Sequence, residues 1–291
     1  MDRKILIGED LHKAAMHNKI PFSTDVGVHV FKRYIALLYR LCVVENNQYD
    51  LLIGPGDSGA VMVYFAELFY KALGINLPTK LAIPIQRFKT RDKKSGKYDN
   101  STLAPLEKGC VVESLSKILF LDDEICEANS ASECAKLVTR DLPEIQKHNR
   151  ILFTIIADNH GFEWHYDVPP VAIQYYSFSR RNKGKNNAAL RILSDEDQAI
   201  LNGFTEPYLD KEDKADGQTK KMNLLFNGMV KVPTYSGDGM SKPRFKHVSM
   251  DKSIFNSVNF LEFRSKIEKN LFTLIRDAID EYKEGKLIFL F

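Results

Sequence analysis

Apolar residues along the first two-thirds of the chain follow two alternating patterns, one helical and one extended. Helical spacing begins near residue 23, where Ser23, Thr24 and Asp25 offer capping groups. The apolar face that follows consists of Phe31, Tyr34, Ile35, Leu38 and Leu41. Continuous apolar runs, which are typical of buried parallel strands, lie at residues 49–53, 81–85, 117–121, 151–157 and 171–176. Helix-like segments follow the first run, at residues 60–73, and the third, where Ser130 and Glu133 form a capping box. This alternation predicts an α/β fold with a parallel sheet.

A polar, basic linker at residues 179–187 ends this alternation. The segments predicted beyond it are a helix at 194–201 capped by Ser194 and Asp197, a charged loop at 207–221, a short apolar stretch at 222–226 and an irregular segment at 233–239. The last segment is a long amphipathic helix at roughly 260–282, in which Phe263, Ile267, Leu271, Ile275 and Ile279 recur every four residues. We therefore predict an α/β domain at residues 1–184 and a smaller, mostly helical unit at residues 185–291.

The composition excludes several classes of protein. The chain of 291 residues is 44% hydrophobic and 27% charged, as in ordinary soluble proteins, and its net charge of +3 does not indicate nucleic-acid binding. No apolar stretch approaches the ~18 residues of a membrane span, and the N-terminus lacks the apolar core of a signal peptide. Four scattered cysteines form no Cys-x-x-Cys pair, so we expect reduced, buried thiols. We expect a cytoplasmic protein without a membrane partner.

Chemistry is expected beyond the carboxyl ends of the strands, where ligands bind in parallel sheets. Three segments leave those ends, at residues 54–59, 87–109 and 122–130. In the third, Asp122 and Asp123 are adjacent carboxylates, which repel each other unless a divalent cation or ligand hydroxyls share the site. The turn after them leads into a helix N-terminus, which favours a phosphate. A phosphorylated sugar fits this sequence, and a solvated acidic turn is the alternative.

The segment 118–130 resembles the phosphoribosyl diphosphate motif of the type I phosphoribosyltransferases: four apolar residues, two acids, two variable positions and a small-residue turn. This resemblance implies a phosphoribosyltransferase-like core that binds phosphoribosyl diphosphate with Mg²⁺. Asp122 and Asp123 would hold the ribose hydroxyls and, through water, the metal. Ala128, Asn129 and Ser130 would cradle the 5′-phosphate. The family has Thr and Gly through residues 126–130, where this chain has Cys-Glu-Ala-Asn-Ser.

Residues 54–59, Gly-Pro-Gly-Asp-Ser-Gly, support two interpretations. One is the dinucleotide-binding pattern G-x-G-x-x-G, which requires an acid near the end of the second strand. The second strand instead ends in Ile85, Gln86 and Arg87. The other is the pyrophosphate loop that phosphoribosyltransferases carry at this place, in which Asp57, Ser58 and Gly59 would receive pyrophosphate.

Six of the eleven residues at 87–97 are basic. They form either a solvated charged loop or a lid over the site. The segment resembles the flap of orotate phosphoribosyltransferases, so that Lys93 corresponds to the catalytic lysine and Lys89 to the first residue of the basic pair. Trp164 is either a structural Trp or a platform for a base.

These segments together predict a phosphoribosyltransferase-like enzyme, with the resemblance covering about residues 25–180. It would transfer ribose 5-phosphate to an unidentified base, nucleotide or macromolecule and release pyrophosphate. Two alternatives stay open: a non-catalytic regulator that senses a nucleotide, and a divergent effector of a bacterial conflict or antiphage system. A homodimer and a nucleic-acid or protein partner also stay open.

Overall fold

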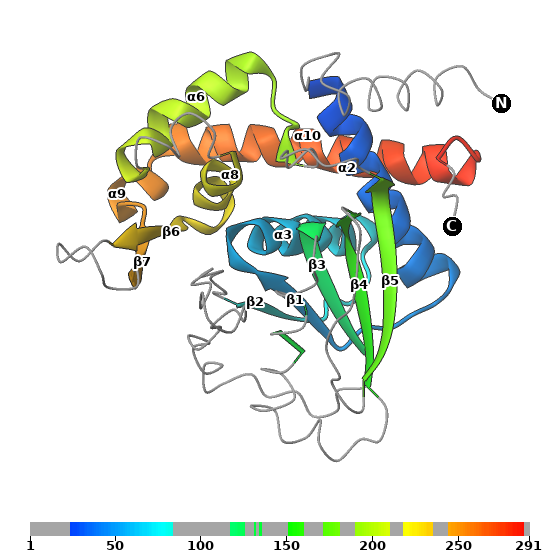
Figure 1. The fold of residues 1–291 in the computed structure, drawn as a ribbon. Coiled ribbons are helices and arrows are strands. Elements are labelled where there is room, and N and C mark those ends of the chain that lie inside the picture. Colours follow the sequence, from blue (N-terminus) through cyan, green and yellow to red (C-terminus); the bar gives the residue numbers. More distant parts are fainter. Residues whose placement is uncertain are drawn as a thin grey trace.

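The computed structural model describes residues 24–83, 117–125, 131, 134–135, 151–159, 171–180, 190–209, 218–234 and 244–287. At its centre is a five-stranded sheet in which every pair of neighbouring strands is parallel (Figure 1). The strands are β1 (Leu51–Pro55), β2 (Thr79–Ile83), β3 (Lys117–Ile125), β4 (Ile151–Asn159) and β5 (Val171–Arg180), in the order β2-β1-β3-β4-β5. The predicted α/β class and parallel sheet are confirmed.

Each predicted apolar run overlaps a strand, and the central strands β1 and β3 are buried on both faces of the sheet. All five residues of β1 are buried, as are Ile118 to Leu121 of β3. Such strands lack the alternation of half-exposed sheets and appear in the sequence as continuous apolar runs. β3, β4 and β5 extend further than predicted, to Ile125, Asn159 and Arg180. The additional residues all lie at the carboxyl ends.

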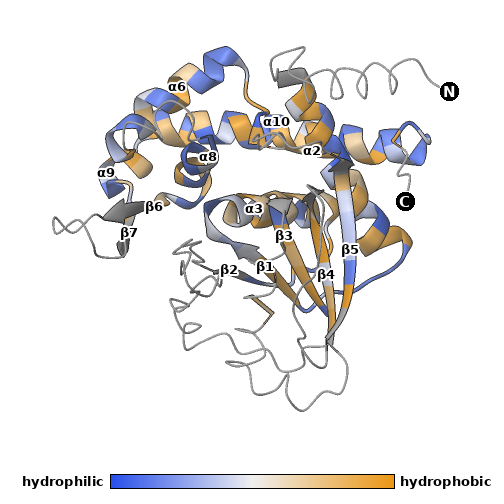
Figure 2. Cartoon of the chain, viewed as in Figure 1, coloured by the Kyte–Doolittle hydropathy of each residue, from blue (hydrophilic) through white to orange (hydrophobic). Residues whose placement is uncertain are grey.

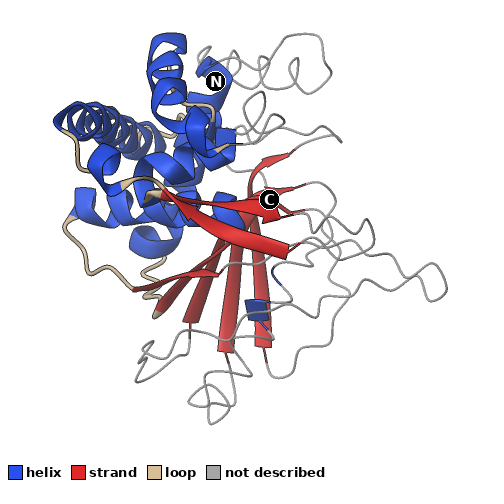
Figure 3. Cartoon of the chain, turned by 90° about the vertical axis from the view of Figure 1, so that its left-hand side faces the viewer, coloured by secondary structure: helices blue, strands red, loops and turns tan. Residues whose placement is uncertain are grey.

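Most of the described helical residues lie on one side of the sheet (Figure 3). Helix α2 (Thr24–Tyr39) continues into a π-helical turn, η1 (Arg40–Val44), and precedes β1. Helix α3 (Gly56–Leu73) connects β1 to β2 and ends at Gly74, which adopts a left-handed φ of 63°. Ten residues of α3 are buried, because α3 packs between the sheet and the helices α2, α8 and α10.

The C-terminal part confirms two predicted helices and corrects the segment between them. Its elements are α6 (Asp195–Thr205), η3 (Glu206–Tyr208), α8 (Gln218–Asn227), β6 (Met229–Thr234), β7 (Arg244–Ser249), α9 (Lys252–Phe255) and α10 (Val258–Lys283). Ser194 caps α6 as predicted, with its side-chain oxygen accepting from the N–H of Asp197 at 3.1 Å. The apolar stretch 222–226 lies inside α8, which also includes the end of the predicted charged loop. β6 and β7 form an antiparallel pair that occupies part of the predicted irregular segment.

Helix α10 has the amphipathic pattern that its sequence predicts (Figure 2). All five residues of the predicted apolar face are buried: Phe263, Ile267, Leu271, Ile275 and Ile279. This face packs on α2 and α3, and Lys32 of α2 donates to Glu281 of α10 at 2.8 Å. Within the described part of the chain, neither α10 nor any other helix has the length and apolar content that a membrane crossing requires.

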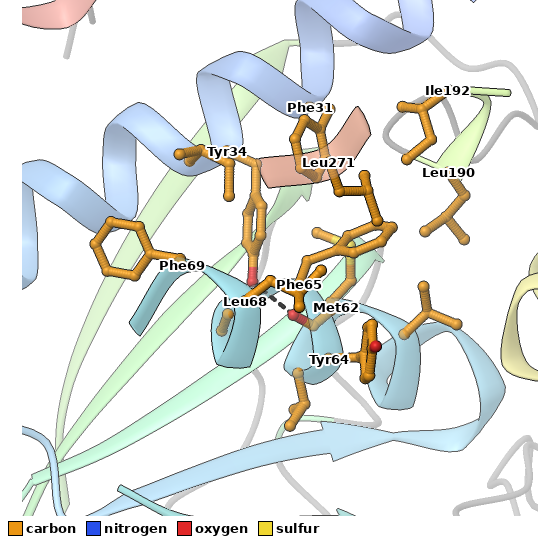
Figure 4. Close-up of a cluster of buried hydrophobic side chains, with 14 of the residues drawn as sticks. Phe31, Tyr34, Met62, Tyr64, Phe65, Leu68, Phe69, Leu190, Ile192 and Leu271 are labelled. Atoms are coloured by element: carbon orange, nitrogen blue, oxygen red, sulfur yellow. Dashed lines mark hydrogen bonds between the residues drawn. The ribbon is translucent and has the colours of Figure 1, made fainter. Parts of the chain in front are cut away.

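One hydrophobic cluster joins the sheet domain to the C-terminal helices. Phe31 of α2, Phe65 of α3 and Leu271 of α10 point toward one another (Figure 4). The rings of Phe31 and Phe65 meet edge to face, with centroids 5.1 Å apart. Nearby, Tyr34 donates its hydroxyl proton to the carbonyl oxygen of Met62 at 2.9 Å (Figure 4). The domain boundary after residue 184 stays a prediction, and this cluster crosses it.

Candidate functional site

The order of the strands defines where a ligand is expected. From β1 the chain passes through α3 to β2 on one side, whereas β3 pairs with β1 on the other side. In open α/β sheets, ligands bind beyond the carboxyl ends of the strands at such a switch point. The register of β1 with β2 continues to Pro55, but its register with β3 ends at the pair Ile53–Phe120. β1 and β3 therefore part at their carboxyl ends.

Asp122 and Asp123 lie at a β-bulge in β3. Leu121 pairs with Ile156 and Glu124 with Asp158, so β3 has one residue more than β4 between these two pairs. Bulges redirect side chains and are frequent beside active sites. Both carboxylates are buried, with 4% and 6% of their surface exposed. The sequence pattern predicted a loop for this pair. That prediction is wrong, because β3 continues to pair with β4 past the bulge and ends at Ile125.

Ser58 connects the first turn of α3 to this acidic pair. Its hydroxyl donates to Oδ1 of Asp122 at 2.9 Å, and the same oxygen accepts from the backbone N–H of Asp123 at 3.0 Å. Hydrogen bonds to a carboxylate are strong and offset part of the cost of burying its charge. The structure thus brings together two predicted site residues that lie 64 positions apart.

The two outer glycines of residues 54–59 are needed where β1 turns into α3. A Cβ on Gly54 would lie 2.2 Å from the carbonyl oxygen of Gly59, and one on Gly59 would lie 2.3 Å from Cδ of Pro55. Gly56 has a φ of 62°, which side chains disfavour. This close approach brings the start of α3 against the end of β1.

Helix α3 begins earlier than the sequence pattern predicts. The pattern placed its start at Ala60, but the helix begins at Gly56. Asp57, Ser58 and Gly59 therefore lie in its first turn and not in a preceding loop. The first-turn N–H groups of a helix have no acceptor within the helix, and they form an anion-binding end together with the helix dipole. The predicted pyrophosphate-binding residues occupy this end.

The side chain of Asp57 is held by helix α8. Its Oδ1 accepts from the amide of Asn223 at 2.7 Å, and Oδ1 of Asn223 accepts from the amide of Asn227 at 2.6 Å. Neither asparagine was predicted from the sequence. Their four-residue spacing places them on one face of a helix, but nothing in the sequence connects that face to Asp57.

Several predicted residues lie outside the described part of the chain. They are Lys89 and Lys93 of the basic segment, Ala128, Asn129 and Ser130 of the proposed phosphate turn, and Trp164. Their roles stay predictions. Of the cysteines, Cys42 and Cys134 are buried free thiols, as expected. Burial raises the pKa of Cys42 to about 11, although a hydrogen bond with Tyr70 opposes the shift.

The chemistry of the donors fits the magnesium ion that the resemblance implies. The side chains of Asp122, Asp123 and Ser58 offer only oxygen atoms as donors, and the two carboxyl groups are buried side by side. Mg²⁺ prefers oxygen ligands, retains several waters and binds through one or two carboxylates plus a substrate phosphate. Among the described residues, no group of three or more His, Cys, Asp and Glu side chains gathers in a way that could hold a metal.

The fold and the site define an α/β protein with a buried acidic pair and a helix N-terminus at the switch point of a parallel sheet. Comparison with known proteins gives no match to a family model, a curated protein or a solved structure. The site itself is therefore the basis on which a function can be proposed.

Proposed function

We propose that this chain is a phosphoribosyltransferase-like enzyme that binds phosphoribosyl diphosphate with Mg²⁺. The observation that carries the proposal is the hydrogen bond from Ser58 to Asp122 at the switch point. It joins an anion-binding helix turn to a buried acidic pair. Phosphoribosyl diphosphate requires both features, one for its pyrophosphate and the other for its ribose hydroxyls and metal.

In this proposal the chain's own groups bind and orient the substrate. The N–H groups of the first turn of α3 receive the pyrophosphate, while Asp122 and Asp123 accept hydrogen bonds from the ribose hydroxyls. Mg²⁺ would be held by the same two carboxylates through water, and it would neutralise charge on the diphosphate. Lys89 and Lys93 would approach the leaving pyrophosphate, and Trp164 would stack on the acceptor.

The reaction exchanges one bond at C1 of the ribose for another. The bond to the pyrophosphate oxygen breaks and its electron pair leaves with pyrophosphate, while an acceptor lone pair forms the new bond and the acceptor releases its proton. Positive charge develops on the ribose between these events. Fixed carboxylates close to the ribose stabilise such charge electrostatically. The buried, hydrogen-bonded Asp122 is suited to this role.

A second candidate, a nucleotide-sensing regulator without catalysis, is favoured by residues 126–130. Glu127 adds a negative charge where the 5′-phosphate would lie, and Ala128 lacks the backbone freedom of the glycine common in the family. The regulator would bind phosphoribosyl diphosphate without releasing pyrophosphate. A pyrophosphate-release assay with mixed bases as acceptors separates the two functions.

The proposal is tested by calorimetric titration of phosphoribosyl diphosphate with Mg²⁺ into the wild type, Asp122→Asn and Asp123→Asn. A hydrogen bond to a charged group contributes about 1.5–3 kcal/mol, so each substitution should weaken binding roughly ten- to a hundredfold. Asp195→Asn is the matched control, because Asp195 is an exposed acid in the first turn of α6. Melting curves check that all variants fold.

Two results would contradict the proposal in different ways. If the wild type binds no phosphoribosyl diphosphate, the substrate is wrong. If the wild type binds and both variants bind equally well, the acidic pair has no role in binding the ligand. In that case each substitution removes a repulsion, and the variants should be as stable as the wild type or slightly more stable.

A further inference from the structure

Helix α8 of the C-terminal part contacts the candidate site through a partly buried chain of hydrogen bonds. Asn223 has 4% of its surface exposed, and it lies in a helix whose residues 221–226 are all buried. Its neighbours on α8 make apolar contacts with α3, among them Phe226, whose ring stacks on Tyr64 with centroids 4.4 Å apart. A buried amide is costly unless its donors and acceptor are hydrogen-bonded. The position of Asn223 is thus determined by its polar partners.

Those partners fix the orientation of the Asn223 amide. Asn227 donates to its oxygen at 2.6 Å, so its NH₂ group faces Asp57, to which it donates at 2.7 Å. The opposite orientation would place two NH₂ groups against each other and an oxygen against a carboxylate. Asn227 therefore aligns Asn223, and Asn223 aligns Asp57.

The position of Asp57 matters because it shares the first turn of α3 with the proposed pyrophosphate site. A carboxylate in a first turn can accept from the same N–H groups that bind an anion, and it repels that anion. The hydrogen bond to Asn223 draws the carboxylate toward α8. Ser58, the next residue, is held in another direction by Asp122. The turn is thus anchored by two elements far apart in the sequence.

We propose that Asn223, aligned by Asn227, is a positioning residue of the site and keeps the Asp57 carboxylate away from the bound pyrophosphate. The C-terminal helices then contribute to ligand binding as well as to the core. This inference rests on the proposed function, because the ligand that Asp57 would otherwise repel is phosphoribosyl diphosphate.

The test exchanges the amide of Asn223 with the carboxylate of Asp57. Asn223→Asp alone opposes two carboxylates across a 2.7 Å contact, so binding of phosphoribosyl diphosphate with Mg²⁺ should weaken at least about tenfold. The double variant Asp57→Asn with Asn223→Asp restores an amide–carboxylate hydrogen bond, and the second carboxylate oxygen still accepts from Asn227. Its affinity should return to within about threefold of the wild type.

Asn202→Asp is the matched control, because Asn202 forms a similar amide pair with Gln198 at 3.0 Å on α6. It should bind like the wild type. If Asn223→Asp does not fold, Asn223→Ser gives the same test without an added charge, with an expected loss of about three- to tenfold. Titration with pyrophosphate and Mg²⁺ should rank all variants in the same order, because the effect is assigned to that part of the ligand.

The outcomes separate the inference from the proposed function. If the wild type binds no phosphoribosyl diphosphate, the proposed function is refuted and the inference with it. If the wild type binds but the Asn223 variants bind equally well, the inference alone is overturned. It is also overturned if Asn223→Asp weakens binding and the exchange does not restore it, since the loss would then not come from the Asp57 contact.

Discussion

Replacing Gly59 by alanine tests whether the close approach of β1 and α3 holds the site together. The new Cβ would lie 2.3 Å from Cδ of Pro55 and 2.5 Å from the carbonyl carbon of Gly54. The nearest atoms belong to backbone or to a rigid ring, so they cannot move independently. Overpacking of this kind costs about 3 kcal/mol, whereas alanine in place of glycine within a helix gains about 1 kcal/mol. The clash outweighs the gain, and we expect a net loss of about 2 kcal/mol.

The loss should lower the melting temperature by roughly 3 °C for a chain of this size. Gly203→Ala is the matched control, because Gly203 also lies in a helix and a Cβ there would meet nothing within 4 Å. That variant should be more stable than the wild type by up to about 1 kcal/mol. The two substitutions are chemically identical and should change stability in opposite directions. If Gly59→Ala melts at or above the wild-type temperature, the contact between Gly54 and Gly59 does not constrain the turn.

Two further predictions concern the core. Ile275→Ala removes a fully buried side chain of α10 and should lower the free energy of unfolding in urea by about 2–5 kcal/mol. Ile200→Ala, at a position that is 39% exposed, should lower it by about 0.5 kcal/mol or less. Equal losses would show that α10 is not part of the core. Burial raises the pKa of Cys42 from 9.0 to about 11, so the folded state holds the thiol proton more tightly than the unfolded state does. The stability that this raised pKa gives the folded state is complete below pH 9.0 and is lost as the pH rises to about 11. Between these two pH values, the melting temperature of Cys42→Ala should therefore fall less steeply than that of the wild type.

Local patterns predicted the elements whose burial is continuous or periodic. The four-residue spacing of Phe263, Ile267 and Leu271 predicted α10, because apolar residues that recur along one side of a helix show which side is buried. The hairpin of β6 and β7 was missed. Pro233 cannot donate a ladder hydrogen bond and indicated an irregular segment, but it pairs with Phe245 in a sheet that has two strands within the described residues. Proline is tolerated in edge strands, and the sequence does not show that a strand will be an edge.

The candidate site was predictable only in part. The rule that ligands bind beyond the carboxyl ends of parallel strands predicted that Ser58 and Asp122 would lie at the same edge, and the structure adds the strand order and their direct contact. The bulge at Asp122 depends on the register between β3 and β4, which residue patterns do not determine. The contact of Asp57 with Asn223 joins positions 166 residues apart. It follows from how α8 packs on α3, and no local signal encodes it.

The packing of α10 on α2 has a consequence for synthesis on the ribosome. Lys32 and Glu281, which bridge these helices, lie 249 positions apart. At a translation rate of about 5–20 residues per second, α10 leaves the exit tunnel roughly 12–50 s after α2. During that interval Phe31 and Phe65 lack their contacts with α10, because Leu271 of α10 lies in the same cluster. Both rings therefore gain their contacts with α10 only after that helix has been made.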